Sequence, residues 1–346
     1  MHICDVGVTQ PSRWQSQIEC RRARTPLNQS VLKNMQLKVS IPVVNLLIYE
    51  PFEFAGVIFT PPSQDAFPDE RNTASILLDG NLSTAITALS GVQLSDFNVA
   101  TAISFEITVE LVDYPTPSRQ DDERVLAEAV FRAEAVMDLI RFDYCRLDIP
   151  QYSPMMAGYI PTVNRIAVSV YDEASGKQRL IAREPDCPIM IPGIGLELES
   201  APSHSEIEAI ISEQHADQSL GIRLRRLLRA FGQAFTASSD DQKILNLIFA
   251  LDGLLTPENC YSDKFKSAIG KWLGGNATHQ ASEHENFAKF YEEVRNHLVH
   301  RGKSYEQLGR DRKADLFYLQ GVISRLLTRL SQYRQLEFSA FWKQHT

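Results

Sequence analysis

The stretch of the sequence best equipped for chemistry lies between Phe287 and Gly302. Arg295, Asn296 and His300 fall there within six residues. Histidine can move a proton near neutral pH, and the guanidinium of arginine presents a fixed fork of donors that suits phosphate oxygens. RNA carries its own nucleophile, the 2′-hydroxyl, so such a pair could act on a phosphodiester without a metal. The residue types predict phosphoryl transfer on RNA, with Arg295, Asn296 and His300 as catalytic residues.

The element that must position these residues is predicted to be a helix ending at Gly302. Its apolar stripe recurs at three- and four-residue spacing through Phe287, Phe290, Tyr291, Val294 and Leu298. In an ideal α-helix Arg295 and His300 lie about 140° apart, too far round to meet on one phosphate. Either the helix frays at Leu298, or a second copy supplies the missing partner across a two-fold axis. We therefore expect a homodimer with the Leu298–Gly302 turn near that axis.

Each of these residues also has a purely structural interpretation. Arg295 could be a solvated helix arginine, and His300 could be a partner of the helix dipole, which contributes a few tenths of a kcal/mol. His297 is expected to orient or bind rather than to act as the base. Asp252, in another apolar helix, is expected to pair with an arginine, and Arg295 is the candidate.

The bulk composition describes an ordinary globular protein. The chain has 346 residues, of which 44% are hydrophobic and 23% charged, enough for two domains with cores of their own. Its five cysteines form no C-x-x-C pair, which favours reduced thiols over a disulfide framework or a zinc site. The sequence opens without a basic stretch followed by an apolar core and has no apolar run of membrane length, so neither a signal peptide nor a membrane span is expected. We expect a cytoplasmic protein without metal, other cofactor or membrane association.

Charge divides the chain into two unlike parts. Residues 1–218 contain 16 Lys and Arg against 30 Asp and Glu, a formal charge of −14, and residues 219–346 contain 19 against 13, a charge of +6. The difference could be chance combined with solubility. Alternatively, the basic part meets a polyanion, because cationic side chains gain free energy by displacing counterions from phosphates.

The front of the chain, residues 1–200, is predicted to be an α+β domain with mainly antiparallel strands. Ala102–Val112 alternates apolar and polar residues, as a half-buried strand does. Val163–Val170 and Gln178–Ala182 are typical of a hairpin that turns near Gly176.

Two other front segments carry clear signals. Met35–Thr60 is β-rich, and Pro42 and Pro51 are expected to break it into two short strands. A helix is expected over Asp121–Asp143, with acidic residues in the first turn, where the helix dipole favours them. Metal binding by those acidic residues is the lesser alternative.

Beyond a junction at Gly193–Asp217 the hydrophobic period changes from two to 3.6, so residues 219–346 are predicted to form an all-α bundle. Arg223, Arg225, Arg226 and Arg229 are expected on a solvated face, with RNA contact as the minority alternative, and His279 and His284 in a loop. The expected helices cover 220–235, 240–255, 264–273, 287–302 and 313–333, followed by a tail at 336–342 that packs back on the bundle.

The motif opened by Arg295 and closed by His300, on a late helix of a small basic bundle, resembles the HEPN domains of prokaryotic defence and toxin proteins. Its lead-in Tyr291–Val294 and its exit Arg301–Gly302 look similar to the Apea-like branch of that family. The run Phe249–Leu255 on an earlier helix does too.

The resemblance covers residues 219–335. It implies a homodimeric, metal-independent endoribonuclease in which the arginine and histidine of both protomers line a cleft at the dimer interface, and asparagine after the arginine is a common family choice. A toxin or anti-phage effector is then expected, with the front domain sensing a phage-derived or host trigger or positioning RNA. The alternatives are a non-catalytic HEPN-like module that binds RNA or a protein, and a helical interaction module without nucleic acid.

Overall fold

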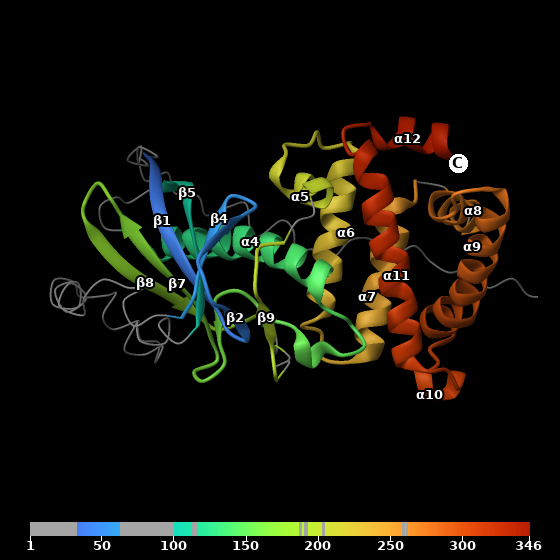
Figure 1. The fold of residues 1–346 in the computed structure, drawn as a ribbon, viewed down its shortest axis with the longest axis horizontal. Coiled ribbons are helices and arrows are strands. Elements are labelled where there is room, and N and C mark those ends of the chain that lie inside the picture. The colour runs from blue at the N-terminus through green and yellow to red at the C-terminus, as the bar shows by residue number, and fades with distance from the viewer. Residues whose placement is uncertain are drawn as a thin grey trace, which may run out of the picture.

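The computed structural model describes residues 33–62, 100–111, 117–186, 189, 193–202, 205–257, 260 and 262–346. Within these ranges an antiparallel sheet occupies one end of the molecule and a group of helices the other (Figure 1). No strand follows residue 220 in this part of the chain. The predicted α+β class, with an antiparallel front and an all-helical back, is therefore confirmed.

The main sheet contains seven strands in the order β3-β4-β5-β1-β7-β6, with β8 also paired to β7, and every pairing in it is antiparallel. Two predicted features are present: β5 matches the alternating segment, and β7 and β8 form the hairpin. A separate parallel pair joins β2 to β9. The strands are β1 (Lys33–Val43), β2 (Leu46–Ile48), β3 (Phe52–Phe54), β4 (Val57–Thr60), β5 (Thr101–Leu111), β6 (Tyr159–Ile160), β7 (Arg165–Asp172), β8 (Lys177–Arg183) and β9 (Leu196–Leu198).

The sequence predicted that Pro42 breaks the first strand, and this prediction is wrong. β1 passes through this residue and pairs with β5 along its whole length, with Pro42 opposite Ala102. The carbonyl of Pro42 accepts from the Gly158 N–H at 2.8 Å, on the side away from β5. In an antiparallel ladder the nitrogen and carbonyl of a residue point to the same side. The missing N–H therefore faces away from β5, and the pairing with β7 has already ended at Ser40.

The long helix α4 (Arg119–Tyr144) packs on one face of the sheet and continues toward the helical half (Figure 1). It matches the predicted helix. The side chain of Ser118 accepts from the Asp121 N–H, and Asp121 in turn accepts from the Ser118 N–H, so the two form a capping box. Asp122 pairs with Arg179 of β8. Two of the acidic residues at this helix start thus have structural partners.

The junction between the halves contains two regular elements. Strand β9 and helix α5 (Ser205–Ser212) both lie within Gly193–Asp217, for which the sequence predicted no secondary structure. Arg225 donates to the carbonyls of Ile210, Ile211 and Glu213 at 2.6 to 3.1 Å and so satisfies the end of α5. The end of a short helix is thereby fixed by a side chain from the next one.

The helical half contains the expected bundle, with one boundary displaced. Helix α9 begins at Ala277, capped by Asn276, ten residues before the expected start at Phe287. His279 and His284 consequently lie in a helix rather than in a loop. None of the helices in the described ranges is long and apolar enough to cross a lipid bilayer. The elements are α6 (Leu220–Ala234), α7 (Asp240–Leu255), α8 (Ser262–Leu273), α9 (Ala277–Phe290), η2 (Tyr291–His300), α10 (Tyr305–Leu308), α11 (Arg312–Leu330), η3 (Ser331–Tyr333) and α12 (Phe338–His345).

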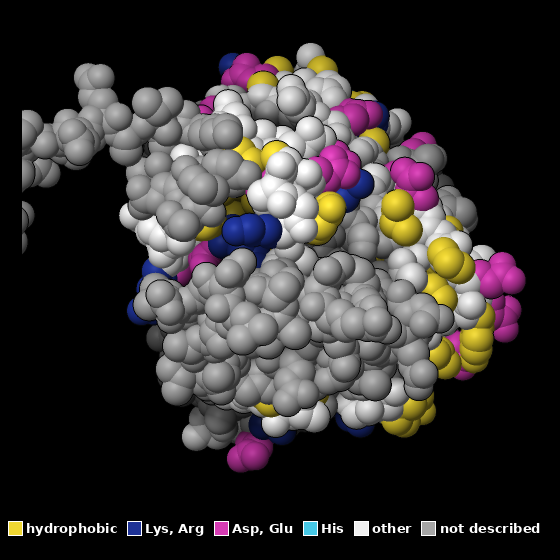
Figure 2. All heavy atoms as spheres, turned by 90° about the vertical axis from the view of Figure 1, so that its left-hand side faces the viewer, with side chains coloured by type: hydrophobic (Ala, Val, Ile, Leu, Met, Phe, Trp, Pro, Cys, Tyr) yellow, Lys and Arg dark blue, Asp and Glu magenta, His cyan; other side chains and the backbone are white. Residues whose placement is uncertain are grey.

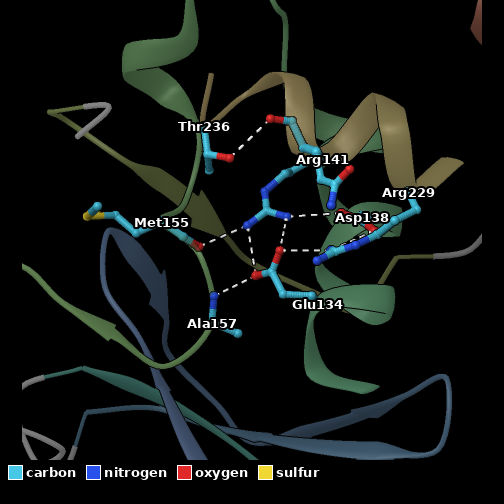
Figure 3. A network of polar contacts seen from close by, with 8 residues as sticks. Glu134, Asp138, Arg141, Met155, Ala157, Arg229 and Thr236 are labelled. Carbon is cyan, nitrogen blue, oxygen red and sulfur yellow. Dashed lines mark hydrogen bonds and ion pairs between the residues drawn. The ribbon is translucent and has the colours of Figure 1, made fainter. Parts of the chain in front are cut away.

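A buried network of charges joins α4 to α6, and we call it the junction network: Glu134, Asp138, Arg141 and Arg229 (Figure 3). The side chain of Arg141 is fully buried and donates to Glu134 and Asp138 at 3.0 to 3.2 Å and to the Met155 carbonyl at 3.0 Å. From α6, Arg229 reaches both carboxylates at 3.1 Å. The network balances two carboxylates against two guanidiniums where the two halves meet.

The electrostatics of the junction network depend on burial. Burial raises the pKa of Asp138 to about 7, although Arg229 and Arg141 oppose the rise. Burial also acts to raise the pKa of Glu134, but Arg141 and Arg229 outweigh it, and that pKa lies below its usual value. Gly232 lets α6 approach this closely, because a Cβ there would lie 1.7 Å from Oδ1 of Asp138.

The expectation of a solvated arginine face on α6 is wrong for three of its four arginines. Arg229 belongs to the junction network and Arg225 closes α5, while Arg223 donates to the Leu254 carbonyl at 2.7 Å and lies 3.9 Å from the Phe338 ring centroid. Arg226 alone is exposed. The packed interior explains the difference, since one continuous hydrophobic core extends through both halves and brings neighbouring elements to α6.

The sheet end of the molecule presents acidic and hydrophobic side chains. Figure 2 looks onto that end and shows the two kinds side by side along one margin. The same half of the chain contains exposed large apolar residues, among them Tyr49, Ile58 and Ile194. Figure 2 also shows Lys and Arg side chains among the described residues of this face.

Candidate active site

The segment that carries Arg295 and His300 is a π-helix, η2, which continues α9 without a break. Backbone bonding in a π-helix runs from residue i to residue i+5, so residues five apart lie on the same side. Arg295 donates through Nη1 to Nε2 of His300. The separation of about 140° expected for an α-helix is therefore wrong. A single chain brings the two residues together, and the helix does not fray at Leu298.

An aromatic core holds η2 in place. Tyr291 and Val294 are buried, and the Tyr291 ring packs against Phe265 of α8 and Phe287 of α9 with centroids 6.1 and 5.7 Å away. The helix ends before Gly302, whose φ of +60° is the left-handed conformation that glycine adopts readily. The apolar stripe and the glycine stop predicted from the sequence thus fix one side and the end of η2.

Arg295 is held by groups from two elements. Asp252 of α7 lies 3.2 Å from its Nη2 and 3.3 Å from its Nε, which confirms the pairing expected from the sequence. The guanidinium carbon lies 5.1 Å from the centroid of the Tyr291 ring. The Tyr291 hydroxyl also donates to Asp252 at 2.6 Å. Burial together with that hydrogen bond raises the pKa of Tyr291. The phenol therefore stays protonated, and Asp252 orients both neighbours.

Asn296 and His300 complete the predicted triplet. The side-chain oxygen of Asn296 lies 3.4 Å from Nη1 of Arg295, the same nitrogen that contacts His300. His300 is exposed, whereas the side chain of Arg295 is 22% exposed. All three predicted catalytic residues therefore meet at one nitrogen, at the accessible end of η2.

His297 faces another side of η2 and has both ring nitrogens engaged. Its Nδ1 donates to the Glu293 carbonyl at 2.9 Å, because a carbonyl can only accept. Its Nε2 then carries the lone pair and accepts from Nη1 of Arg301 at 3.1 Å. His297 is thus placed to orient Arg301 and has no free nitrogen for a proton transfer.

A polar hollow of 450 Å³ lies beside the triplet, between α8 and η2. Asn296, His297 and Arg301 line one side of it, and Lys266 lines the other. Lys266 spans the two elements, at 2.7 Å from Glu292 and 2.9 Å from Asp263. We call this space the η2 hollow. Lys266 and Arg301 were not among the predicted site residues, although Arg301 directly follows the motif, and that position was a signal.

A metal site is not visible in the described ranges, where no group of three or more His, Cys, Asp and Glu side chains could hold an ion. Comparisons with protein-family models, with curated proteins and with solved structures find no match for this chain. The resemblance of residues 219–335 to HEPN domains therefore stays a prediction from the sequence motif.

Proposed function

We propose that the chain is a metal-independent endoribonuclease of the HEPN type. The contact between Arg295 and His300 supports it, because it unites a phosphate-binding group and a proton-transfer group at an accessible helix end. Asp252 and Tyr291 hold the arginine from behind, so the guanidinium is oriented before a substrate arrives. The net positive charge of residues 219–346 favours approach of a polyanion.

The reaction follows from the chemistry of the pair. A phosphate oxygen takes the place of His300 on Arg295, and the freed Nε2 accepts the proton of the 2′-hydroxyl. The 2′-oxygen then attacks phosphorus, the bond to the 5′-oxygen breaks, and Arg295 stabilises the charge on the non-bridging oxygens. The products are a 2′,3′-cyclic phosphate and a 5′-hydroxyl end. DNA lacks the attacking hydroxyl and is not cut.

A homodimer remains part of the proposal, but for a different reason. The angle between Arg295 and His300, which first suggested a dimer, no longer requires one. In an in-line displacement the attacking and leaving oxygens lie on opposite sides of phosphorus. One imidazole that takes the first proton is therefore poorly placed to protonate the leaving 5′-oxygen. A second copy of η2 could supply the second group, and so could a water molecule, which makes the oligomeric state of the active species worth measuring.

Regulation by the front half is also proposed. That half would position RNA or respond to a phage-derived or host trigger, as in a toxin or an anti-phage effector. The junction network supports coupling, because α4 of the front half shares its buried charges with α6 of the bundle. A change in the front half could reach the bundle through this contact.

The test is cleavage of total RNA in EDTA by wild-type protein and by His300→Ala. Loss of the proton-transfer group should reduce the rate on the order of 10²–10⁴-fold. His279→Ala is the matched control, because His279 is an exposed histidine in α9, outside the triplet, and should keep full activity. The denaturant concentration at the midpoint of unfolding should be the same for both variants as for the wild type.

Two outcomes would refute the proposal: equal cleavage by wild type and His300→Ala, or cleavage that requires a divalent metal. RNA binding without cleavage would favour the alternative, a non-catalytic HEPN-like module. Asp252, Glu292 and Glu293 place three carboxylates beside the motif, and they weaken the positive field there, which favours the protein-binding form of this alternative over RNA binding.

A further inference from the structure

The η2 hollow lies next to the Arg295–His300 pair, and Asn296 connects the two. Asn296 contacts Arg295 on one side and lines the hollow on the other. Successive nucleotides of a single strand are covalently linked, so a nucleotide next to the phosphodiester on Arg295 must pass close to this space. A volume of 450 Å³ lies within the usual range of small-molecule sites and accommodates a nucleobase.

Arg301 provides donors on one side of the η2 hollow. A guanidinium has five N–H donors, and the contact with His297 uses one nitrogen of the group. His297 cannot move freely, because its other ring nitrogen is bound to the Glu293 carbonyl at 2.9 Å. The result is an exposed arginine whose position is set by a buttressing histidine.

Carboxylates provide acceptors in the same hollow. Glu292 is exposed over 59% of its side chain and uses Oε1 to bind Lys266 at 2.7 Å. Its carboxylate has further acceptor sites, because each of its oxygens carries two lone pairs. With Asp263 and Glu293 also in the lining, a second phosphate would meet like charges. A neutral, polar group suits the hollow better than a phosphate does.

We propose that the η2 hollow binds the base of a nucleotide that flanks the cut, and that this base is guanine. The proposal rests on the ribonuclease function and defines its substrate as single-stranded RNA with guanine beside the scissile bond. Guanine offers two acceptors, O6 and N7, to an arginine fork, the commonest specific base contact of arginine. It also offers N1–H and N2–H as donors, which a carboxylate such as Glu292 accepts. Unpaired bases are the form in which RNA presents these edges.

The experiment compares cleavage sites in a synthetic pool of random single-stranded RNA, read by sequencing the product ends. Wild type should show guanine enriched at one position next to the cut. Arg301→Gln removes the fork and should lower that enrichment about tenfold, while cleavage itself continues. Lys303→Gln is the matched control, because it removes the same charge from an exposed position two residues away that does not line the hollow. It should keep the preference.

The possible outcomes distinguish failure of the guanine site from failure of the ribonuclease function on which it rests. No cleavage by wild type would refute the ribonuclease function itself. Cleavage by wild type without base preference, or with a preference that Arg301→Gln leaves unchanged, would refute the guanine site and leave the function standing. An equal loss of rate in Arg301→Gln and Lys303→Gln, at every sequence, would mean that Arg301 contributes charge alone, and would also overturn the proposal.

Discussion

Two clusters in this molecule use the same chemical groups in opposite ways. In the junction network Arg141 is 0% exposed, and its partners Glu134 and Asp138 are 3% and 1% exposed. At the candidate site Arg295 and Asp252 are 22% and 20% exposed. Arg141 contacts protein groups from α4 and the segment after it, whereas Arg295 contacts an imidazole that stands at the surface.

Burial explains the difference in role. A buried charge is costly unless it is paired, so the junction network must stay closed in the folded state. A partly exposed pair is screened by water and costs little to open. The contact of Arg295 with the exposed His300 can therefore be exchanged for a ligand, whereas the contact between Glu134 and Arg141 cannot. Burial of the carboxylates, more than residue type, marks one cluster as structural and the other as a candidate for chemistry, since Arg229 of the junction network is itself 26% exposed.

The largest predicted effect is the loss of stability when a buried arginine of the junction network is replaced. Arg141→Met should lower the free energy of unfolding by about 3–5 kcal/mol, because it leaves two buried carboxylates with incomplete compensation. Arg295→Met, the matched change at the candidate site, should cost less than about 1 kcal/mol. Urea denaturation monitored by circular dichroism measures both values. A cost for Arg295→Met as large as that for Arg141→Met would remove the distinction between the clusters.

A second pair of variants tests how tightly the junction is packed. Gly232→Ala places a methyl group against Asp138, at 1.7 Å in the present backbone, and should destabilise the protein by about 1–3 kcal/mol. Gly253→Ala is the control, since nothing lies within 4 Å of a Cβ there. That change should be neutral or stabilising by up to about 1 kcal/mol, because alanine favours a helix. Thermal unfolding of both proteins would show the opposite signs, and a wild-type melting temperature for Gly232→Ala would argue against the close contact.

The smallest prediction concerns the support of Arg295. Asp252→Asn keeps the shape of the side chain but removes its charge, so the guanidinium should be held less firmly and RNA cleavage should fall about tenfold, or about 1.4 kcal/mol. Asp241→Asn serves as the control, because Asp241 lies in the same helix but pairs with Arg312 at 2.7 Å. Initial rates in EDTA compare the two. Equal rates for both variants would show that Asp252 does not position the arginine.

The sequence predicted those parts of the fold that depend on periodicity. The alternation over Ala102–Val112 and the 3.6-residue period beyond residue 219 gave the strand and the helices, because burial of one face imposes those spacings. Pro42 was misjudged, since its tolerance depends on which side of β1 remains unpaired. The early start of α9 was missed because its first turns lie largely at the surface and show no apolar stripe.

The candidate site was predicted in part. The triplet and the pairing of Asp252 with Arg295 were available from residue types alone. The direct contact of Arg295 with His300 was not, because it depends on a backbone hydrogen-bond pattern that apolar spacing does not report. The junction network was equally hidden. Arg229 had the appearance of one member of a solvated row, and only the approach of α4 shows what it binds.

The π-helix has a consequence for how the pair could be taken apart. Its wider turn makes an interval of five residues bring side chains together, where an α-helix would need three or four. A change of η2 from i+5 to i+4 bonding would turn His300 away from Arg295 without unfolding the segment or moving either residue out of the helix. The geometry of the site therefore depends on the backbone hydrogen-bond pattern of η2, a segment of ten residues. Deleting one residue between Arg295 and His300 would change that pattern directly.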